Sequence, residues 1–342
     1  MANPPAPSPS PHPARLEAVG FCGADDSVNP RLLKLISQNY PLVEWGVLFR
    51  PDREGQPRYA SEAWVSRLSQ NLHDDEEDDE DDGDAGGGGG ERRKRTGRRT
   101  GGVRLAAHLC GSHVNDLLSS SANPECASRI DAFLLKLRGW GFGRVQVNAT
   151  AINGVDTERL LASSGGDWWM TTTTAAAAAT SFLRTASAHP DLEFIVQRND
   201  ETEPLWSALL PRLARRSAPP DDDNVVFLHD ESKGTGKSVP GGVWPTDARF
   251  ASSNVRNVVG YAGGICPSNV VSAVEGASRA CAASGGDRFW IDMESGVRTT
   301  TVSKKDDDGT RREVDIFDLS KCYDCIDGLC EAGWMDHPPG LQ

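Results

Sequence analysis

Reactive side chains stand at the ends of several apolar segments of the sequence. Cys22 ends the apolar segment 16–22, and Asp230 directly follows the apolar segment 224–229. A carboxyl group at the mouth of an apolar strand is costly unless it has a partner or a chemical task. A thiol in such a position can take part in proton transfer, although a lone cysteine also fits as a small buried residue. Cys22 and Asp230 are therefore the catalytic candidates.

Glycine-bearing segments follow the last apolar segments and are suited to hold an anion. Glycine lets the backbone approach a ligand closely, and exposed N–H groups in such loops can cradle a phosphate. The sequence Gly236-Lys237-Ser238 is not the end of a nucleotide-binding P-loop, because Glu231 stands where that motif needs its first glycine. We predict that the phosphate of a substrate binds to Gly234, Gly236, Gly263, Gly264, Ser295 and Gly296, while Arg58, Gln146 and Asp292 contact its remainder.

Eight short apolar segments, most of them rich in β-branched or aromatic residues, precede these polar residues. Segments typical of helices separate them, and alternation of this kind indicates a parallel sheet. Eight such units predict a closed (β/α)8 TIM barrel, with catalytic groups at the carboxyl ends of the strands. The competing doubly wound sheet lacks a G-x-G-x-x-G after the first strand. The expected strands are Leu16–Cys22, Val43–Phe49, Val103–Cys110, Arg144–Asn148, Leu192–Arg198, Asn224–His229, Val255–Ala262 and Phe289–Met293.

The remaining segments set the domain boundaries. Residues 1–14 are rich in proline and serine, which predicts a disordered tail. We expect residues 15–335 to form the barrel and residues 336–342 to form a second tail. Residues 73–102 form a charged, glycine-rich insertion, and residues 163–180 a second insertion rich in serine, threonine and alanine whose alanine run is able to extend a helix. The charged insertion lies between a helix and a strand, so we expect it on the face opposite the active site, as a solvated loop or a regulatory segment.

Composition narrows the function classes. The net charge is −13, and ten acidic residues lie within residues 74–84. A chain this acidic is a poor general binder of nucleic acid or of an anionic membrane. The N-terminus has no apolar core of a secretory signal, no apolar run reaches membrane-spanning length, and the eight cysteines show no disulfide framework. These features predict a cytoplasmic protein with free thiols, and they leave organelle import and the oligomeric state open.

Two sets of residues could be drawn as metal sites. Cys322, Cys325, Cys330 and His337 lie on or after a terminal helix and lack a second knuckle, so they make a poor zinc site. His108 and His113 are five residues apart, which is poor helical spacing for two ligands of one ion. We predict no metal and no cofactor.

The order of these motifs resembles phosphoribosylanthranilate isomerase, a (β/α)8 barrel of tryptophan biosynthesis. The resemblance covers about residues 16–330, apart from the insertions, and rests on five motifs in the right order. The matching segments are Cys22-Gly23, Gly46–Phe49 with Arg58-Tyr59, Leu228–Asp230 with Gly234–Lys237, Ala262–Val270 and Asp292–Arg298.

The resemblance implies an isomerase of the aldose–ketose type. Its reaction is the Amadori rearrangement of a phosphorylated aminoribose, with Cys22 as general base and Asp230 as general acid. Arg58 would contact the anthranilate carboxylate, and the backbones at Gly263-Gly264 and Ser295-Gly296 would hold the phosphate. Such a pair would protonate the ring oxygen of the sugar and deprotonate the neighbouring carbon.

Several positions depart from the family. Gly20 replaces a lysine two residues before the cysteine, Glu294 replaces a serine, Arg298 replaces a glutamate, and Asn148 interrupts the strand-4 motif. A carboxylate beside a bound phosphate is unfavourable. Two alternatives therefore stay open: a related barrel enzyme that uses Asp230 and Asp292 on a different phosphorylated or anionic molecule, and a barrel that binds a metabolite without turnover.

Overall fold

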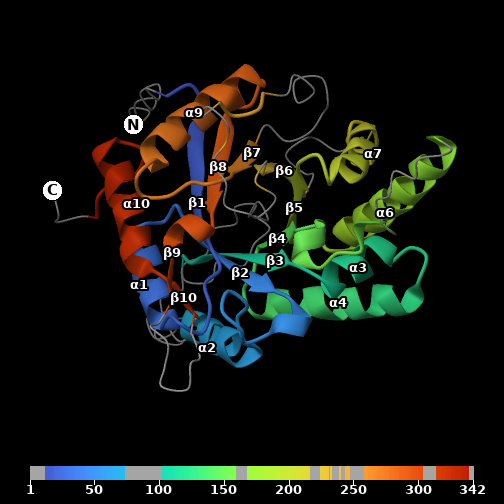
Figure 1. Ribbon diagram of the computed structural model, residues 1–342, viewed down its shortest axis with the longest axis horizontal. Helices are drawn as coiled ribbons and strands as arrows, with labels where there is room; N and C mark the ends of the chain where they lie inside the picture. The colour runs from blue at the N-terminus through green and yellow to red at the C-terminus, as the bar shows by residue number, and fades with distance from the viewer. Residues whose placement is uncertain are drawn as a thin grey trace, which may run out of the picture.

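The computed structural model describes residues 12–73, 102–158, 168–215, 224–230, 232, 239, 243–246, 258–302 and 313–338. Eight parallel strands in it pair in the order β1 to β8, and β8 pairs with β1, which closes the sheet into a barrel (Figure 1). The predicted (β/α)8 barrel is thereby confirmed. The strands are β1 (Arg15–Cys22), β2 (Val43–Phe49), β3 (Arg104–Leu109), β4 (Arg144–Val147), β5 (Glu193–Arg198), β6 (Val225–Asp230), β7 (Val258–Ala262) and β8 (Arg288–Met293).

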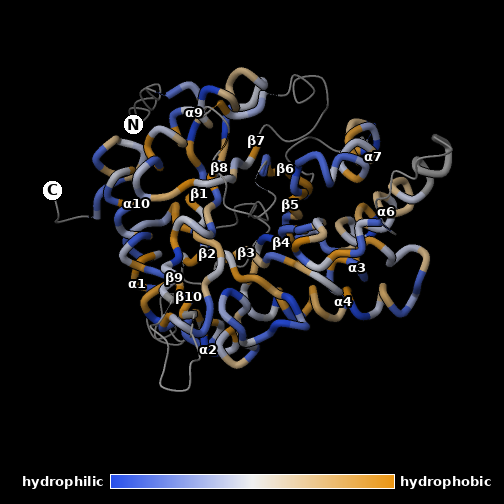
Figure 2. The backbone as a smooth tube through the Cα atoms, viewed as in Figure 1, coloured by the Kyte–Doolittle hydropathy of each residue, from blue (hydrophilic) through white to orange (hydrophobic). Residues whose placement is uncertain are grey.

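Helices cover the outside of the barrel and begin where the sequence caps them. Asn29 precedes the first helix and accepts a hydrogen bond from the N–H of Arg31, and Asn123 caps the fourth in the same way. Figure 2 shows helices with both hydrophilic and hydrophobic stretches, as expected where one face packs on a barrel. The helices are α1 (Pro30–Asn39), α2 (Glu62–His73), α3 (Ser112–Ser119), α4 (Pro124–Gly139), α6 (Trp168–Ala188), α7 (Glu203–Leu213), α9 (Val270–Ala283) and α10 (Leu319–Glu331). None of these described helices is long and apolar enough to cross a lipid bilayer.

The two ends of the chain differ from the sequence-based boundaries. Ala14, placed in the predicted tail, is buried, and its backbone exchanges two hydrogen bonds with the hydroxyl of Ser278. After β8 the chain adds an antiparallel hairpin, β9 (Arg298–Val302) and β10 (Glu313–Phe317), which the sequence analysis missed. The described part of the 163–180 insertion, from residue 168, begins helix α6, and most of the 73–102 insertion lies outside the described residues.

Side-chain alternation along the strands sorts the barrel interior into layers. Successive residues of a strand point to opposite faces, so residues two apart share the interior. The middle of the barrel is apolar, with Ala18, Val226, Leu228 and Trp290 in one buried cluster. At the carboxyl ends of the strands, Cys22, Gln146, Asp230 and Asp292 line one pocket. A separate buried ion pair joins Arg144 to Glu44 near the amino ends of β4 and β2.

Gly260 on β7 provides the space for the Trp290 ring inside the barrel. A Cβ atom at this position would lie 2.3 Å from the Trp290 ring and 2.5 Å from a Leu228 methyl group. We expect Gly260→Ala to destabilise the protein by about 1–3 kcal/mol or more, because overpacking a filled core forces side chains off their rotamers. Urea denaturation followed by tryptophan fluorescence measures this loss.

The control is Gly143→Ala, at a position where an added Cβ meets no atom within 4 Å. Equal losses of stability in the two variants would contradict the assigned packing of Trp290.

Candidate functional site

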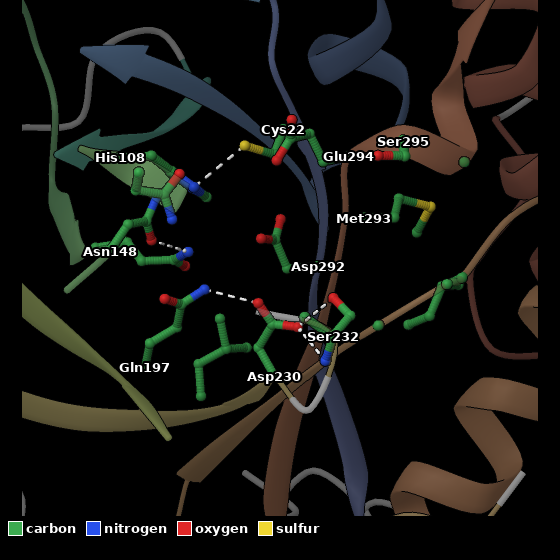
Figure 3. Close-up of a pocket in the computed structure, with 18 residues that line it drawn as sticks. Cys22, His108, Asn148, Gln197, Asp230, Ser232, Asp292, Met293, Glu294 and Ser295 are labelled. Atoms are coloured by element: carbon green, nitrogen blue, oxygen red, sulfur yellow. Dashed lines mark hydrogen bonds between the residues drawn. The ribbon is translucent and has the colours of Figure 1, made fainter. Parts of the chain in front are cut away.

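A pocket opens at the carboxyl ends of the strands and brings together residues from most of the barrel. Figure 3 shows Cys22, Asp292 and Asp230 arranged across it, with Asp292 between the other two. Of the residues predicted from the sequence, the pocket is lined by Cys22, Gln146, Asp230, Gly263, Gly264, Asp292, Ser295 and Gly296. Gly234 and Gly236 lie outside the described residues.

Cys22 pairs with a histidine that the sequence analysis did not select. The Sγ atom of Cys22 lies 3.1 Å from Nδ1 of His108, and both side chains are buried. These residues belong to β1 and β3, with β2 between them. A Cβ atom at Gly46 of β2 would lie 2.9 Å from both Cys22 Cα and His108 Nε2. The pair therefore depends on a glycine in the intervening strand.

The pocket environment favours the neutral forms of both members of this pair. Burial raises the pKa of the Cys22 thiol well above its usual value, and the nearby Asp292 and Glu294 raise it further. Burial, followed by the charge of Arg144, lowers the pKa of His108 to about 3. At neutral pH the side chains are a thiol and an uncharged imidazole, unless a cation enters the pocket.

Asp230 is fixed on the opposite side of the barrel. Its carboxylate accepts a hydrogen bond of 2.7 Å from Gln197 Nε2 and bonds of 2.6 and 3.1 Å from the hydroxyl and the N–H of Ser232. Both carboxylate oxygens thus have donors, and the residue is buried at the end of β6. This leaves Asp230 in a defined orientation, which a proton-transferring group requires.

Asp292 has no comparable support. Its carboxylate makes neither a hydrogen bond nor an ion pair with any residue that the structure describes, although it is only 9% exposed. Burial raises its pKa well above the usual value, and the charges of Glu44, Glu294 and Asp230 add to this effect. The space for its side chain comes from Gly20, where a Cβ atom would lie 2.6 Å from Asp292 Oδ1.

Arg58 does not line the pocket but pairs with a residue that does. Its guanidinium donates to Glu294 at 2.9 Å and to Asp315 of the β9–β10 hairpin at 2.7 Å. Burial raises the pKa of Glu294, which Arg58 partly offsets. The backbone of Arg58 has a left-handed φ of 76°, and its N–H donates to Asp25 at 2.7 Å. The guanidinium group of Arg58, which the sequence predicted to contact the substrate, is therefore already paired with Glu294 and Asp315.

Arg298 joins the hairpin to the barrel from a buried position. Its guanidinium, only 1% exposed, donates to Asp25 at 2.8 Å, to Asp315 at 2.7 Å and to the carbonyl of Gly23. The Arg298 side chain thus fixes the loop after β1 against the segment after β8, beside Glu294.

The glycine loops after β7 and β8 pack tightly against each other. Gly263 and Gly264 have left-handed φ angles of 129° and 63°, and Asn269 donates to the Gly264 carbonyl and accepts from the N–H of Cys266. A Cβ atom at Gly296 would lie 2.0 Å from the carbonyl oxygen of Ile265. Such loops suit a ligand that the backbone must approach closely.

Comparisons with known proteins identify no family for this chain. No protein-family profile matches the chain, and no curated protein matches it in sequence. Solved structures that it resembles include D-psicose 3-epimerase from Clostridium cellulolyticum H10 (TM-score 0.38, 13% identity, 82% of this chain and 86% of that chain). A GH18 chitinase from Pseudoalteromonas aurantia (0.41, 8%, 83% and 94%) and the β-glycosidase BGL167 (0.41, 12%, 95% and 98%) are also similar. The fold assignment therefore rests on the strand pairing of this chain.

Removal of the buried Arg298 guanidinium tests its supporting role. We expect Arg298→Met to lower the free energy of unfolding by about 3–5 kcal/mol, because it leaves the buried Asp25 carboxylate without its ion-pair partner. The control Arg15→Ala removes a side chain that is 68% exposed, and it should change stability by no more than about 0.5 kcal/mol. Chemical denaturation compares the two, and a loss below about 1 kcal/mol for Arg298→Met would contradict the buried network.

Asp315 gives the same network a pH dependence. Burial raises its pKa, but hydrogen bonds from Arg298 and Arg58 outweigh this and hold the pKa below its usual value. The stability from Asp315 is therefore present above its unfolded-state pKa of about 3.9 and is lost as the pH falls through the lower folded-state pKa. We expect the difference in melting temperature between the native protein and Asp315→Asn to be largest near neutral pH and to shrink in acid. A difference that grows in acid would contradict this sign.

Proposed function

We propose that this barrel is an isomerase of the aldose–ketose type that acts on a phosphorylated, polyhydroxylated small molecule. The observation that supports it best is the position of Asp230, oriented by Gln197 and Ser232, across one pocket from the Cys22–His108 pair. In the closed strand order, β6 lies three strands from β1 and three from β3, so these groups act on a substrate from opposite sides.

The reaction needs two proton transfers and no external oxidant. One proton leaves the carbon next to the carbonyl and returns at the former carbonyl carbon, by way of an enediol or enolamine. The hydroxyl group on the neighbouring carbon loses a second proton as it becomes the new carbonyl, and a proton is added to the former carbonyl oxygen or nitrogen. Asp230 is the proton carrier that the geometry favours, because hydrogen bonds from Gln197 and Ser232 fix its orientation in the pocket. The resemblance assigns the base to Cys22, but the raised pKa of the thiol argues against a free thiolate at neutral pH.

In this proposal the glycine-containing loops after β7 and β8 bind the phosphate of the substrate. Backbone N–H groups of Gly264, Ser295 and Gly296 face no acceptor among the hydrogen bonds of the described residues. Amides in such loops bind phosphate without a fixed positive charge. A phosphate here would lie close to Glu294, whose charge Arg58 neutralises at 2.9 Å. This pairing reduces the repulsion that Glu294 would otherwise impose.

The same pairing bears on the choice of substrate. Phosphoribosylanthranilate carries a carboxylate that the resemblance assigns to Arg58, and Arg58 already contacts two carboxylates. A phosphorylated sugar or aminosugar without that carboxylate fits the pocket charges better. Phosphoribosylanthranilate remains the first member of the substrate panel, because the motif order resembles the isomerase that uses it.

Asp230→Asn tests the proposed proton carrier. We expect kcat on the accepted phosphosugar to fall by about 10²–10⁴-fold, the contribution of a positioned acid–base group. Asparagine can still accept from Ser232, and the Gln197 amide can rotate to accept from it, so the fold should persist. Coupled assays over a panel of phosphorylated aldoses, with phosphoribosylanthranilate included, measure turnover.

Asp324→Asn is the matched control, since it makes the same exchange at an exposed position of α10. Binding of phosphosugars by thermal shift without turnover of any panel member would overturn the isomerase proposal and favour a metabolite-binding barrel.

A further inference from the structure

Three potential metal ligands meet inside the pocket. The Sγ atom of Cys22, a ring nitrogen of His108 and a carboxylate oxygen of Asp292 all lie within 4.8 Å of one another, and all three residues are buried. They come from β1, β3 and β8, so the barrel itself brings them together (Figure 3). Ligands of one zinc ion, each about 2.0–2.3 Å from it, lie roughly 3–4 Å apart, so small side-chain rotations would complete the arrangement.

The donor types select the ion. A thiolate and an imidazole favour a borderline-soft metal such as Zn²⁺ over Mg²⁺ or Ca²⁺, which prefer oxygen ligands. Three protein ligands with one open position is the pattern of a zinc site that meets a substrate, whereas structural zinc sites use four. The cluster faces the pocket rather than the helices, which matches the open type.

An independent observation is the shortage of positive charge around Asp292. The nearby arginines are already engaged: Arg144 pairs at 2.7 Å with both Glu44 and Glu193, and Arg58 pairs with Glu294. Asp292 is left without a hydrogen bond or ion pair among the described residues. A buried carboxylate normally has a partner or a metal, and a divalent cation between Asp292 and Cys22 would provide the missing charge.

A second observation is an unpaired oxygen in the same pocket. Gln197 is 3% exposed and lines the pocket, and its Nε2 donates to Asp230, but its Oε1 atom has no hydrogen-bond partner among the residues that the structure describes. A buried amide oxygen without a donor is uncommon in folded proteins. A water molecule or a substrate hydroxyl held by an ion in this pocket would supply that donor.

The barrel backbone is shaped for this convergence. Gly46 leaves room for Cys22 and His108 to meet across β2, and Gly20 leaves room for the Asp292 carboxylate on β1. Side chains at both positions would separate the three donors. The two glycines therefore preorganise the cluster, as a metal site requires.

We propose that Cys22, His108 and Asp292 bind one Zn²⁺ ion, with the open position directed into the pocket that contains Asp230. Binding releases the thiol proton of Cys22, which then serves as a ligand and not as a free base. The catalytic part of this inference rests on the proposed isomerase: the ion would polarise the substrate carbonyl, and the proton on the neighbouring carbon would pass to Asp230 and return at the former carbonyl carbon. The proton of the neighbouring hydroxyl group would pass to the former carbonyl oxygen, so that the new carbonyl forms at the neighbouring carbon. No further reactant is consumed.

Metal binding is measured on the full chain without substrate. The protein is stripped with a chelator and reloaded with Zn²⁺ or Co²⁺. We expect one equivalent of Zn²⁺ by mass spectrometry, and a thiolate-to-cobalt charge-transfer band in the Co²⁺ form. Cys22→Ser should abolish that band, and His108→Gln and Asp292→Asn should each weaken Zn²⁺ binding by more than the 10- to 100-fold that loss of an outer-shell partner costs.

Two controls remove thiols elsewhere: Cys126→Ala on α4, and Cys325→Ala in the α10 group considered from the sequence. Both should retain the metal and the band. Unchanged binding in the three ligand variants, or loss of binding in Cys325→Ala alone, would overturn the proposal, as would a native protein that binds no Zn²⁺. If Cys22→Ser does not fold, His108→Gln and the cobalt spectrum of the native protein decide the question.

The metal test and the turnover test fail separately. A chain that binds no Zn²⁺ but isomerises a phosphosugar refutes the metal site and leaves the isomerase. A chain that binds Zn²⁺ through these three residues but turns over no substrate of the panel retains the metal site and refutes the isomerase.

Discussion

The crowding of acidic groups at one mouth of the barrel is the constraint around which this site is organised. Asp230, Asp292 and Glu294 line a single buried pocket together with the Cys22 thiol. Like charges in a region of low dielectric repel strongly, so each needs a donor, a cation or a proton. Asp230 obtains donors from neighbouring strands and Glu294 obtains Arg58, whereas Asp292 obtains neither from the described residues. The pocket therefore favours either a proton on Asp292 or a bound cation beside it.

The closed barrel determines how close these acidic groups lie to one another. Residues at the carboxyl ends of parallel strands converge because the sheet closes on itself, and inward positions alternate with outward ones. These residues can converge only where neighbouring positions have no side chain. Gly46 and Gly20 provide this space in the strands, and Gly296 provides it between the last two loops. These glycines differ from turn glycines, since they make space for a neighbouring group instead of permitting a backbone angle.

Much of the fold and part of the site could be predicted from the sequence. The strands were identifiable because β-branched and aromatic runs alternate with capped helices. Cys22, Asp230 and Asp292 stand at or near the carboxyl ends of these strands, and they were therefore expected in one pocket. The hairpin after β8 was missed because both of its strands are only five residues long and β9, with the sequence RTTTV, has a single apolar residue. His108 was considered together with His113 as a pair of metal ligands, and its contact with Cys22 was not predicted because the two residues are 86 positions apart. The engagement of Arg58 likewise depends on Asp315, which no local pattern links to it.

The departures from the resembled family form a consistent set when their contacts are considered together. Where that family has a strand-1 lysine, Gly20 here leaves space that the Asp292 carboxylate enters. Glu294 and Arg298, in place of the family's serine and glutamate, join ion pairs with Arg58 and Asp25 that tie the β9–β10 hairpin to the site. In this chain the Arg58 and Arg298 guanidinium groups pair with carboxylates around the pocket, and neither forms an ion pair with Asp292. The lack of an ion-pair partner for Asp292 among the described residues is the physical argument for the proposed metal at Cys22, His108 and Asp292.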